Sequence, residues 1–484
     1  MKPSEKEMKD PTVADTMNDG NEDFAVGSTE QLAPTKYTMG KFYRSVLFQM
    51  VLFGCLSFVG PAMSDAISNL GGGGLSSPWL ANLANSLNYA CSFLVTIIGG
   101  PLVNKIGIKW ACFIAALAMP LYGSAYYVNA RFSVDWYLLA SNIIGGVASG
   151  FLYVGETTAM LSYPSPEDRG FYLGIWSAMR NSGSVIGGAI NFSNNHSQST
   201  GGGIAWVTYL IFLGFECTGV IWALLLSKTA KVRRRDNSKI LISKMQTWKQ
   251  EFVSLGHYLR ESKTWLVFVP AFYSFFYGGT LGTYLSLHFS VRSRALSSLI
   301  VPSITIPSVI GFGRFLDNQR WSQRTRAWIA FMLWVIPQTA CFIWINIENH
   351  QLGKKSALDY SLDGSRWAKA YMPYLIIFVS GYWTQLTLYW VLGTFSNKTE
   401  VQSRAGGVFR AFEVAGQAIS YGINSNKTVG YEASLYINTA LLVLVVPAMI
   451  ALISKVPLRP MVEEARGLNE AEGRAGEGEV GKGE

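Results

Sequence analysis

Four ionisable side chains stand out inside long apolar stretches of this chain: Glu156, Arg180, Glu216 and Glu413. An ionisable group surrounded by hydrocarbon is costly unless it is paired or hydrated, so each of the four is a candidate for function. Such groups can pair with one another, take up and release a proton, or contact a polar solute.

Glu156 and Arg180 form the most specific pair that the sequence predicts. They fall in two consecutive apolar stretches, 136–161 and 171–192, which are expected to form antiparallel helices. Along those helices their depths differ by only ~6 Å, a gap that two long side chains can close. We therefore expect an ion pair, which is either part of a functional site or a permanent pair that only fixes the two helices.

These residues belong to twelve apolar stretches, each about the 20 residues that a helix needs to cross a bilayer. Charged residues make up only 15% of the chain, and 48 glycines are present. The stretches lie at 44–64, 80–103, 110–130, 136–161, 171–192, 205–226, 264–288, 298–316, 327–347, 371–394, 405–425 and 433–454. The predicted fold is an all-α membrane protein with twelve transmembrane helices in two pseudo-symmetric six-helix bundles.

The bundles are expected at 41–228 and 264–456, joined by a basic central loop at 229–263. The terminal tails, 1–40 and 457–484, are polar and are predicted to be disordered. The five cysteines all fall inside apolar stretches and are expected to be buried thiols. The four histidines are scattered, so no metal site is expected, and no cofactor motif is present.

Two pairs of matching segments indicate that one six-helix unit occurs twice. The first pair is a G-x-x-x-[N/D] turn between two apolar stretches, at Gly100–Lys109 and at Gly313–Arg320. The second pair is Gly183–Asn191 and Gly416–Asn424, each of which begins with Gly and ends with Ile-Asn. Small residues at such spacing let helix backbones approach closely. We expect Gly183, Gly187 and Gly416 to pack helices together, the first two against the other bundle.

The turn has a chemistry of its own. Its carboxylate or amide can cap the N-terminus of a neighbouring helix, where backbone N–H groups lack partners. Such a clamp would hold one conformation of the two bundles. In the first copy the acid is replaced by Asn104, which can accept a hydrogen bond but carries no charge. The residues of the two turns singled out here are Gly100, Asn104, Lys105, Gly107, Lys109, Gly313, Asp317 and Arg320.

The distribution of Lys and Arg predicts the orientation. The stretch 227–263 holds ten Lys and Arg against three acids, so it and both termini are expected on the cytoplasmic side of a plasma membrane or endomembrane. Anionic lipid head groups are the expected partners of this stretch, and nucleic acid is not. Asn195 and Asn426 begin glycosylation sequons that are then outside, whereas the sequon at Asn397 is inside.

The turns after the second and eighth stretches resemble the signature loop of the major facilitator superfamily, with Asn104 as a departure. A closer resemblance is to fungal UNC-93-like proteins. It rests on five segments of the first half: 70–74, Trp79–Asn85, Gly155–Pro164, Arg169–Trp176 and Gly187–Asn191. The resemblance implies a central cavity lined by the first, fourth, seventh and tenth helices. Those helices offer Gln49, Tyr153, Tyr277, Tyr284, Trp383, Gln385 and Trp390.

Two functions stay open at this point. The first is a secondary transporter that moves a small organic solute by alternating access, with protons passing through Glu156 or Glu413 if it is proton-coupled. The second is a non-transporting regulatory or trafficking protein that binds another membrane protein, as the resemblance to UNC-93-like proteins allows. An enzyme is not expected.

Overall fold

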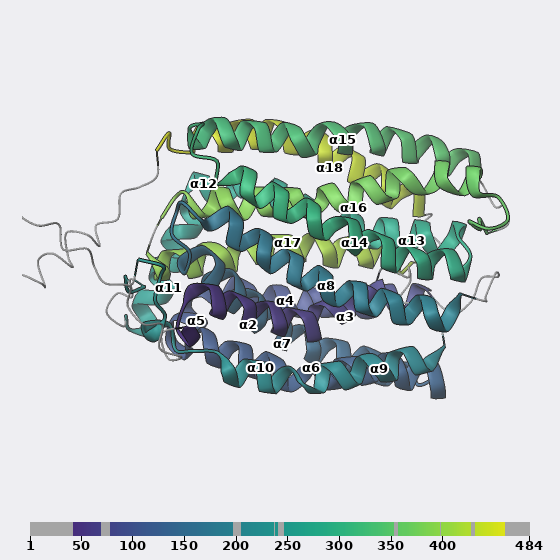
Figure 1. Ribbon diagram of the computed structural model, residues 1–484, viewed down its shortest axis with the longest axis horizontal. Coiled ribbons are helices and arrows are strands. Elements are labelled where there is room, and N and C mark those ends of the chain that lie inside the picture. Colours follow the sequence, from purple (N-terminus) through teal and green to yellow (C-terminus); the bar gives the residue numbers. More distant parts are fainter. Residues whose placement is uncertain are drawn as a thin grey trace, which may run out of the picture. The chain divides into compact units, whose positions relative to one another are not determined.

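The computed structural model describes residues 42–68, 78–196, 205–236, 238–240, 246–352, 357–396, 398–426 and 431–459. The predicted tails, except 457–459, and the glycine run at 71–74 lie outside these residues. Helices dominate the described part of the chain (Figure 1). Those of the first half are α2 (Val46–Val59), α3 (Pro61–Ser68), α4 (Pro78–Ile97), α5 (Gly99–Ile106), α6 (Ile108–Phe132), α7 (Asp135–Ser162), α8 (Arg169–Asn195), α9 (Trp206–Cys217) and α10 (Gly219–Leu225). The later ones are α11 (Trp248–Arg260), α12 (Ser262–Ser274), α13 (Tyr277–His288), α14 (Val291–Leu316), α15 (Gln323–Leu352), α16 (Gly364–Gly393), α17 (Thr399–Asn424) and α18 (Tyr431–Ser454).

Each predicted apolar stretch corresponds to one of these helices or to a broken pair. Eight described spans are long and apolar enough to cross a membrane, and the α4–α5 pair, bent by 65°, makes nine. The other three stretches are α8, α17 and the α12–α13 pair. The first two have the polar composition of helices that face another part of the protein more than lipid.

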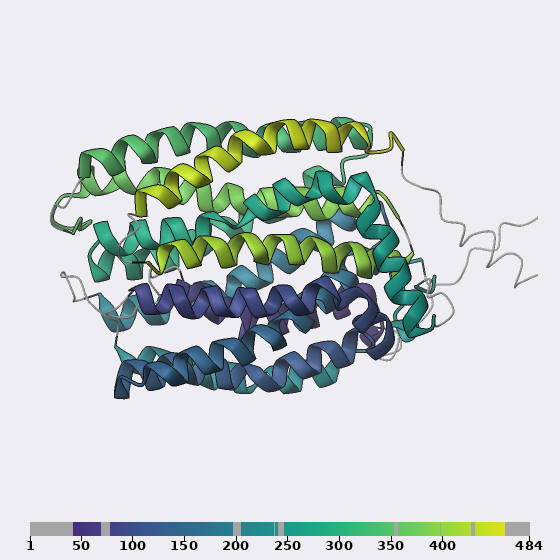
Figure 2. The ribbon, with the colours of Figure 1, turned by 180° about the vertical axis from the view of Figure 1, so that it is seen from behind.

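The two halves meet along two helix pairs. Helix α8 of the first half packs along α14 of the second, and α17 packs along α4. In the duplicated unit these are the fifth helix against the eighth and the eleventh against the second, so the interface is itself pseudo-symmetric. Figures 1 and 2 show α8, α14, α4 and α17 in the middle of the molecule, with α6 and α10 on one side and α15 and α18 on the other.

Glycines allow the close approach of α8 to α14, but they are not the ones predicted. A Cβ on Gly170 would lie 2.5 Å from the carbonyl oxygen of Gly313, and one on Gly188 would collide with the backbone of Ser298. The prediction that Gly183 and Gly187 contact the other half is wrong. They face Ala62 and Ala66 of their own half, at 2.7 and 2.6 Å from an added Cβ. Gly416 likewise packs on Phe272 within the second half.

The helical period explains this error. At 3.6 residues per turn, Gly170 and Gly188 point in nearly the same direction, whereas Gly183 and Gly187 are rotated from them by roughly 100° or more. The sequence shows which helix is rich in glycine. It does not show which of its faces meets the other half.

The central basic segment holds a helix, α11, that the sequence analysis described only as a loop. It begins with a capping box, in which Thr247 and Gln250 bond each other's backbone N–H. Helix α11 contacts α5 of the first half and α12 and α17 of the second. In Figure 2 it runs across one end of the long helices.

Candidate functional site: a cavity between the halves

A cavity of about 50 Å³ lies between the two halves. It is lined by residues of α3, α4, α7 and α8 from the first half, and of α13, α16 and α17 from the second. Its lining combines two arginines and one acid with amides and aromatic rings. The lining residues are Asp65, Tyr89, Tyr153, Arg180, Phe275, Tyr277, Gly278, Phe378, Tyr382, Gln385, Arg410, Gln417 and Tyr421.

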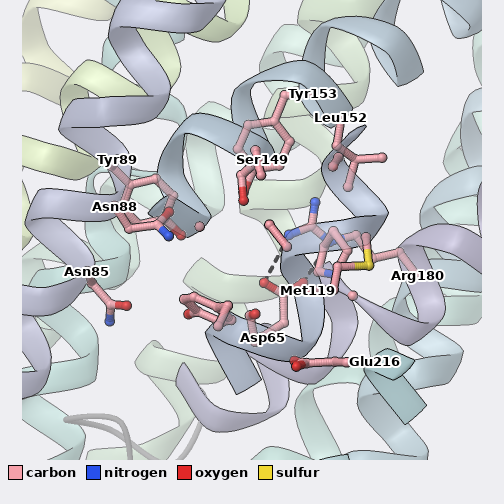
Figure 3. A pocket seen from close by; sticks show the side chains of 18 residues that line it. Asp65, Asn85, Asn88, Tyr89, Met119, Ser149, Leu152, Tyr153, Arg180 and Glu216 are labelled. Atoms are coloured by element: carbon pink, nitrogen blue, oxygen red, sulfur yellow. Dashed lines mark hydrogen bonds and ion pairs between the residues drawn. The ribbon is translucent and has the colours of Figure 1, made fainter. Parts of the chain in front are cut away.

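Arg180 pairs with Asp65, not with Glu156. Its Nε donates to Asp65 Oδ2 at 2.6 Å and its Nη2 to Oδ1 at 2.9 Å, which makes the pair bidentate (Figure 3). Glu156 is buried and accepts a hydrogen bond from Ser57. The predicted Glu156–Arg180 pair is therefore wrong. The first span was expected to end at residue 64, but the helical course continues through α3, and this brings Asp65 inside.

Arg410 is the second cavity cation, and it was not among the candidates from the sequence. It pairs with Glu413 one turn further along α17. Glu413 also accepts hydrogen bonds from Ser274 Oγ at 3.0 Å and Gln385 Nε2 at 2.8 Å. The Arg410 guanidinium lies 4.0 Å from the ring centre of Tyr153, a cation–π contact between the halves. Each cavity arginine is thus neutralised by a carboxylate of its own half.

Aromatic rings from both halves enclose the cavity. Tyr89 of α4 stacks on Tyr421 of α17, with ring centres 5.6 Å apart and planes at 21°. Phe275 meets Tyr382 edge to face at 5.6 Å, and both of these rings also line the cavity. Stacking and edge-to-face contacts of this kind can be exchanged for contacts with an aromatic or planar solute.

Three of the predicted cavity residues line the cavity: Tyr153, Tyr277 and Gln385. The other four are held elsewhere. Gln49 accepts from the Ser227 backbone N–H at 2.8 Å, and Tyr284 donates to the Ala370 carbonyl at 3.0 Å. Trp383 stacks on Phe312 at 5.4 Å, and Trp390 lies 5.1 Å from the Arg326 guanidinium.

A second cavity of about 50 Å³ lies within the first half, and the Asp65–Arg180 pair lines it (Figure 3). Asp65, Tyr89, Tyr153 and Arg180 line both cavities. Glu216 of α9 also lines the second cavity and is 1% exposed. Its carboxylate lies against Gly123 of α6, where an added Cβ would be 1.7 Å from Oε2. Sequence analysis selected Glu216 but could not assign it a role.

The two copies of the G-x-x-x-[N/D] turn lie at one end of the halves, which we call the turn end. Asp317 of the second copy caps α8, because its carboxylate accepts from the N–H groups of Gly170 at 2.7 Å and Phe171 at 2.6 Å. This is the contact with a helix N-terminus that the turn predicts. Burial raises the pKa of Asp317 to about 7.

The first copy reaches the other half in a different way. Asn104 Oδ1 accepts from Ser403 Oγ of α17 at 2.6 Å, and its Nδ2 donates to Glu251 of α11 at 3.0 Å. The same Glu251 oxygen accepts from Arg404 at 2.9 Å. Glu251 is 2% exposed. Glu251 of α11 therefore supplies the carboxylate that this copy of the turn lacks.

The remaining residues of the turns have simpler contacts. A Cβ on Gly100 would lie 2.6 Å from the Cα of Arg404, so glycine is required for this close approach. Gly107 joins α5 to α6 with a φ of 89°, which favours glycine. Lys105 donates to the Gln246 carbonyl and Lys109 to the Leu224 carbonyl. Arg320 is exposed.

The halves also touch at the other end, which we call the sequon end because Asn195 and Asn426 lie there. Asn82 Nδ2 donates to the Asn424 carbonyl at 2.9 Å and to Thr283 Oγ1 at 3.2 Å. Asn191 Nδ2 donates to Ser298 Oγ at 3.4 Å. Contacts between the halves therefore lie on both sides of the central cavity, which is too small for an organic solute.

Two of the three predicted sequons begin at described residues. Asn195 is fully buried, donates to the Asn191 carbonyl and accepts from the Ala205 N–H. Glycosylation of Asn195 stays a prediction, and it would have to precede folding, because the folded chain covers this side chain. Asn426 is exposed, and Asn397 lies outside the described residues.

Comparison with known proteins finds one matching family model, two similar relatives and one solved structure with the same fold. The model of the Major Facilitator Superfamily matches residues 46–421. The notoamide biosynthesis cluster protein O′ of Aspergillus versicolor is 32% identical over 84% of this chain and 87% of its own length. UNC93-like protein 1 of Arabidopsis thaliana is 27% identical over 85% of this chain and 90% of its own. Among solved structures, the proton:xylose symporter XylE bound to 6-bromo-6-deoxy-D-glucose shares the fold, with a TM-score of 0.59 at 12% identity over 89% of this chain and 100% of its own.

Proposed function

Because the chain belongs to the major facilitator superfamily, as an UNC-93-like integral membrane protein, we propose that it is a secondary transporter. It moves a small organic solute across the membrane by alternating access. The observation that carries this proposal is the central cavity, which is lined by charged and aromatic groups from both halves and has contacts between the halves on either side of it.

Alternating access requires each end to open while the other stays closed. At the turn end the closing contacts are a few hydrogen bonds to Asp317, Asn104 and Glu251. At the sequon end they are the amides of Asn82 and Asn191. These hydrogen bonds can break at one end and form at the other when one half rocks against the other. Water can replace each of them, because each is a local polar contact.

Glu156 is the better of the two proton-coupling candidates that the sequence suggested. Glu413 is held by Arg410, Ser274 and Gln385. Glu156 accepts only from Ser57 among the described residues, so protonation would break fewer interactions there. We therefore propose that Glu156 takes up and releases the proton if transport is proton-coupled.

The orientation completes the proposal. The central segment and both termini face the cytoplasm, in a plasma membrane or endomembrane, with anionic lipid head groups against the basic stretch. The turn end is then cytoplasmic, and the exposed Asn426 faces the opposite side. The name of the Aspergillus versicolor relative places it in a biosynthesis cluster. This supports a small metabolite as the solute.

A second function has one observation in its favour, namely that several relatives carry the name UNC93-like. In this alternative the chain regulates or escorts another membrane protein and carries no solute. The uncharged Asn104 would favour this alternative if the turn lacked a carboxylate. Glu251 removes that argument, since it restores a carboxylate at the same contact.

The test compares metabolites inside and outside cells with and without this chain by mass spectrometry. Gly188→Leu, which forces a side chain into Ser298, should abolish any difference in metabolite distribution while the protein still reaches its membrane. Gly214→Leu is the matched control, because a Cβ at this exposed position meets nothing within 4 Å. Metabolite levels that do not depend on the chain, together with a mislocalised partner protein in its absence, would favour the second function.

A further inference from the structure

Two residues of the cavity lining carry a buried polar atom that has no hydrogen-bond partner among the described residues, namely Arg410 Nε and the Tyr277 hydroxyl. The Tyr277 hydroxyl packs against Gly381 of its own half, so it does not face the cavity. Arg410 packs against Tyr153 of the other half, so its Nε can become accessible when the halves separate. The Gln417 amide lines the same cavity and makes no hydrogen bond in the described part of the chain. Buried donors without partners are rare in native structures, so Arg410 Nε is the donor that calls for a ligand.

The charges around the cavity are already balanced. Arg180 is paired with Asp65 and Arg410 with Glu413. Glu156, a buried acid of α7, adds either nothing or one negative charge according to its protonation. In both states the set has no net positive charge. An anionic ligand would have to displace a carboxylate from an arginine and leave it unpaired in a buried site, which is costly.

A cationic ligand is disfavoured for a different reason. The Arg410 guanidinium already occupies the face of Tyr153, at 4.0 Å from the ring centre. The cavity face of this aromatic ring is therefore covered by positive charge. The unpartnered Arg410 Nε is also a donor, and a donor calls for an acceptor.

The aromatic lining sets the shape of the ligand. The Tyr89–Tyr421 stack joins the two halves at the cavity, and the Phe275–Tyr382 pair also lines it. A flat ring system can slide between such faces when the halves separate, and it replaces one ring contact with another. Gln417 offers both a donor and an acceptor to an amide on that ring system.

We propose that the central cavity selects an uncharged, planar organic solute with a carbonyl or amide acceptor, which accepts a hydrogen bond from Arg410 Nε when the halves separate. This inference rests on the proposed transport function and narrows its substrate class. Its test uses binding alone, so that its failure can be told apart from failure of the transport function.

The test measures binding of four naphthalene probes to the purified full chain in nanodiscs by isothermal titration calorimetry. They are 2-naphthamide, 2-naphthoate, 2-naphthylmethylammonium and naphthalene. The uncharged amide should bind most tightly, with naphthalene about tenfold weaker because it lacks the acceptor for a charged donor. Tighter binding of 2-naphthoate or of the ammonium probe, or no binding of the amide, would overturn the inference.

Arg410→Lys separates the hydrogen bond from the charge. It keeps a cation beside Glu413 but removes the Nε donor, so the affinity for 2-naphthamide should fall about tenfold while that for naphthalene stays unchanged. Arg292→Lys, at the Arg292–Asp359 pair away from the cavity, is the matched control and should change neither. An equal loss for both probes in Arg410→Lys would contradict the assigned hydrogen bond.

Transport of the same probes into proteoliposomes then separates the two claims. The predicted binding order without any flux of 2-naphthamide supports the ligand class and contradicts the transport function. Flux of 2-naphthoate that exceeds that of the amide supports transport and contradicts the ligand class.

Discussion

Asn104 Nδ2 donates a hydrogen bond to Glu251 Oε2 at 3.0 Å, although the two residues come from different parts of the chain. Arg404 of the other half donates to the same oxygen at 2.9 Å. Helix α11 therefore inserts a carboxylate between α5 and α17. A central segment that connects the halves also takes part in closing them.

Glu251→Gln should open the turn end. The change leaves the buried Arg404 without its carboxylate, and removing one partner of a buried pair costs roughly 3 kcal/mol. Adding Asn104→Asp to Glu251→Gln should restore part of the closure, because it returns a carboxylate near Arg404. Accessibility of a cysteine at Ser403 to a thiol reagent is the measurement. A double variant as accessible as Glu251→Gln alone would show that the two positions do not share this role.

The Asp65–Arg180 pair should behave as a coupled unit. Asp65→Asn leaves the partly buried guanidinium of Arg180 unpaired, so the melting temperature should fall. Arg180→Gln in addition should recover part of the loss, because a pair removed together costs less than one partner. Glu156→Gln with Arg180→Gln should come closer to the sum of its single changes, since Glu156 bonds Ser57 instead. Stronger coupling of Arg180 to Glu156 than to Asp65 would contradict the structure.

Closure of the turn end should depend on pH through Asp317. Its pKa is raised from 3.8 to about 7 by burial, so the closed end binds the proton more tightly than an open, hydrated one. Closure is therefore favoured at low pH and is lost as pH rises through about 7. The accessibility of a cysteine placed at Phe171 to a thiol reagent should rise between pH 5 and pH 8. Asp317→Asn should abolish most of that rise. Accessibility that falls with pH would reverse the sign and contradict this account.

Glycosylation offers a simple test of orientation. Asn426 is exposed at the sequon end, whereas Asn195 is buried there. If the sequon end faces away from the cytoplasm, Asn426→Gln should abolish a mobility shift on deglycosylation and Asn195→Gln should leave it. A mobility shift that depends on Asn195 would show that this side chain is modified during synthesis, before folding buries it.

The fold could be predicted from the sequence because its main signal is the length of apolar stretches, and the repeated turns fix their order. The site was predicted less well because it depends on which face of each helix points inward. In a helix that is apolar all round, no period marks that face. Tyr153 and Tyr284 look alike in sequence, yet only the former lines the cavity.

Two further residues were missed for physical reasons that can be stated. Asp65 lay just beyond the predicted end of the first span, where helix boundaries are least reliable. Glu251 lies in a basic segment that has the composition of a loop, and its partners are more than 140 residues away in the chain. One sequence feature points to Glu251: the turn has an uncharged Asn104 where an acid is expected, so the basic Arg404 needs a carboxylate from another segment.

Spin-label distances across the two ends test alternating access most directly. One pair of labels joins Glu167 to Arg320 at the turn end, and the other joins His196 to Leu362 at the sequon end; all four positions are exposed, and Cys217 is replaced by Ser beforehand. Gly170→Leu should lengthen the first distance while the second stays short, and Gly188→Leu should do the reverse. Both distances lengthening together in either variant, or neither changing, would contradict the account.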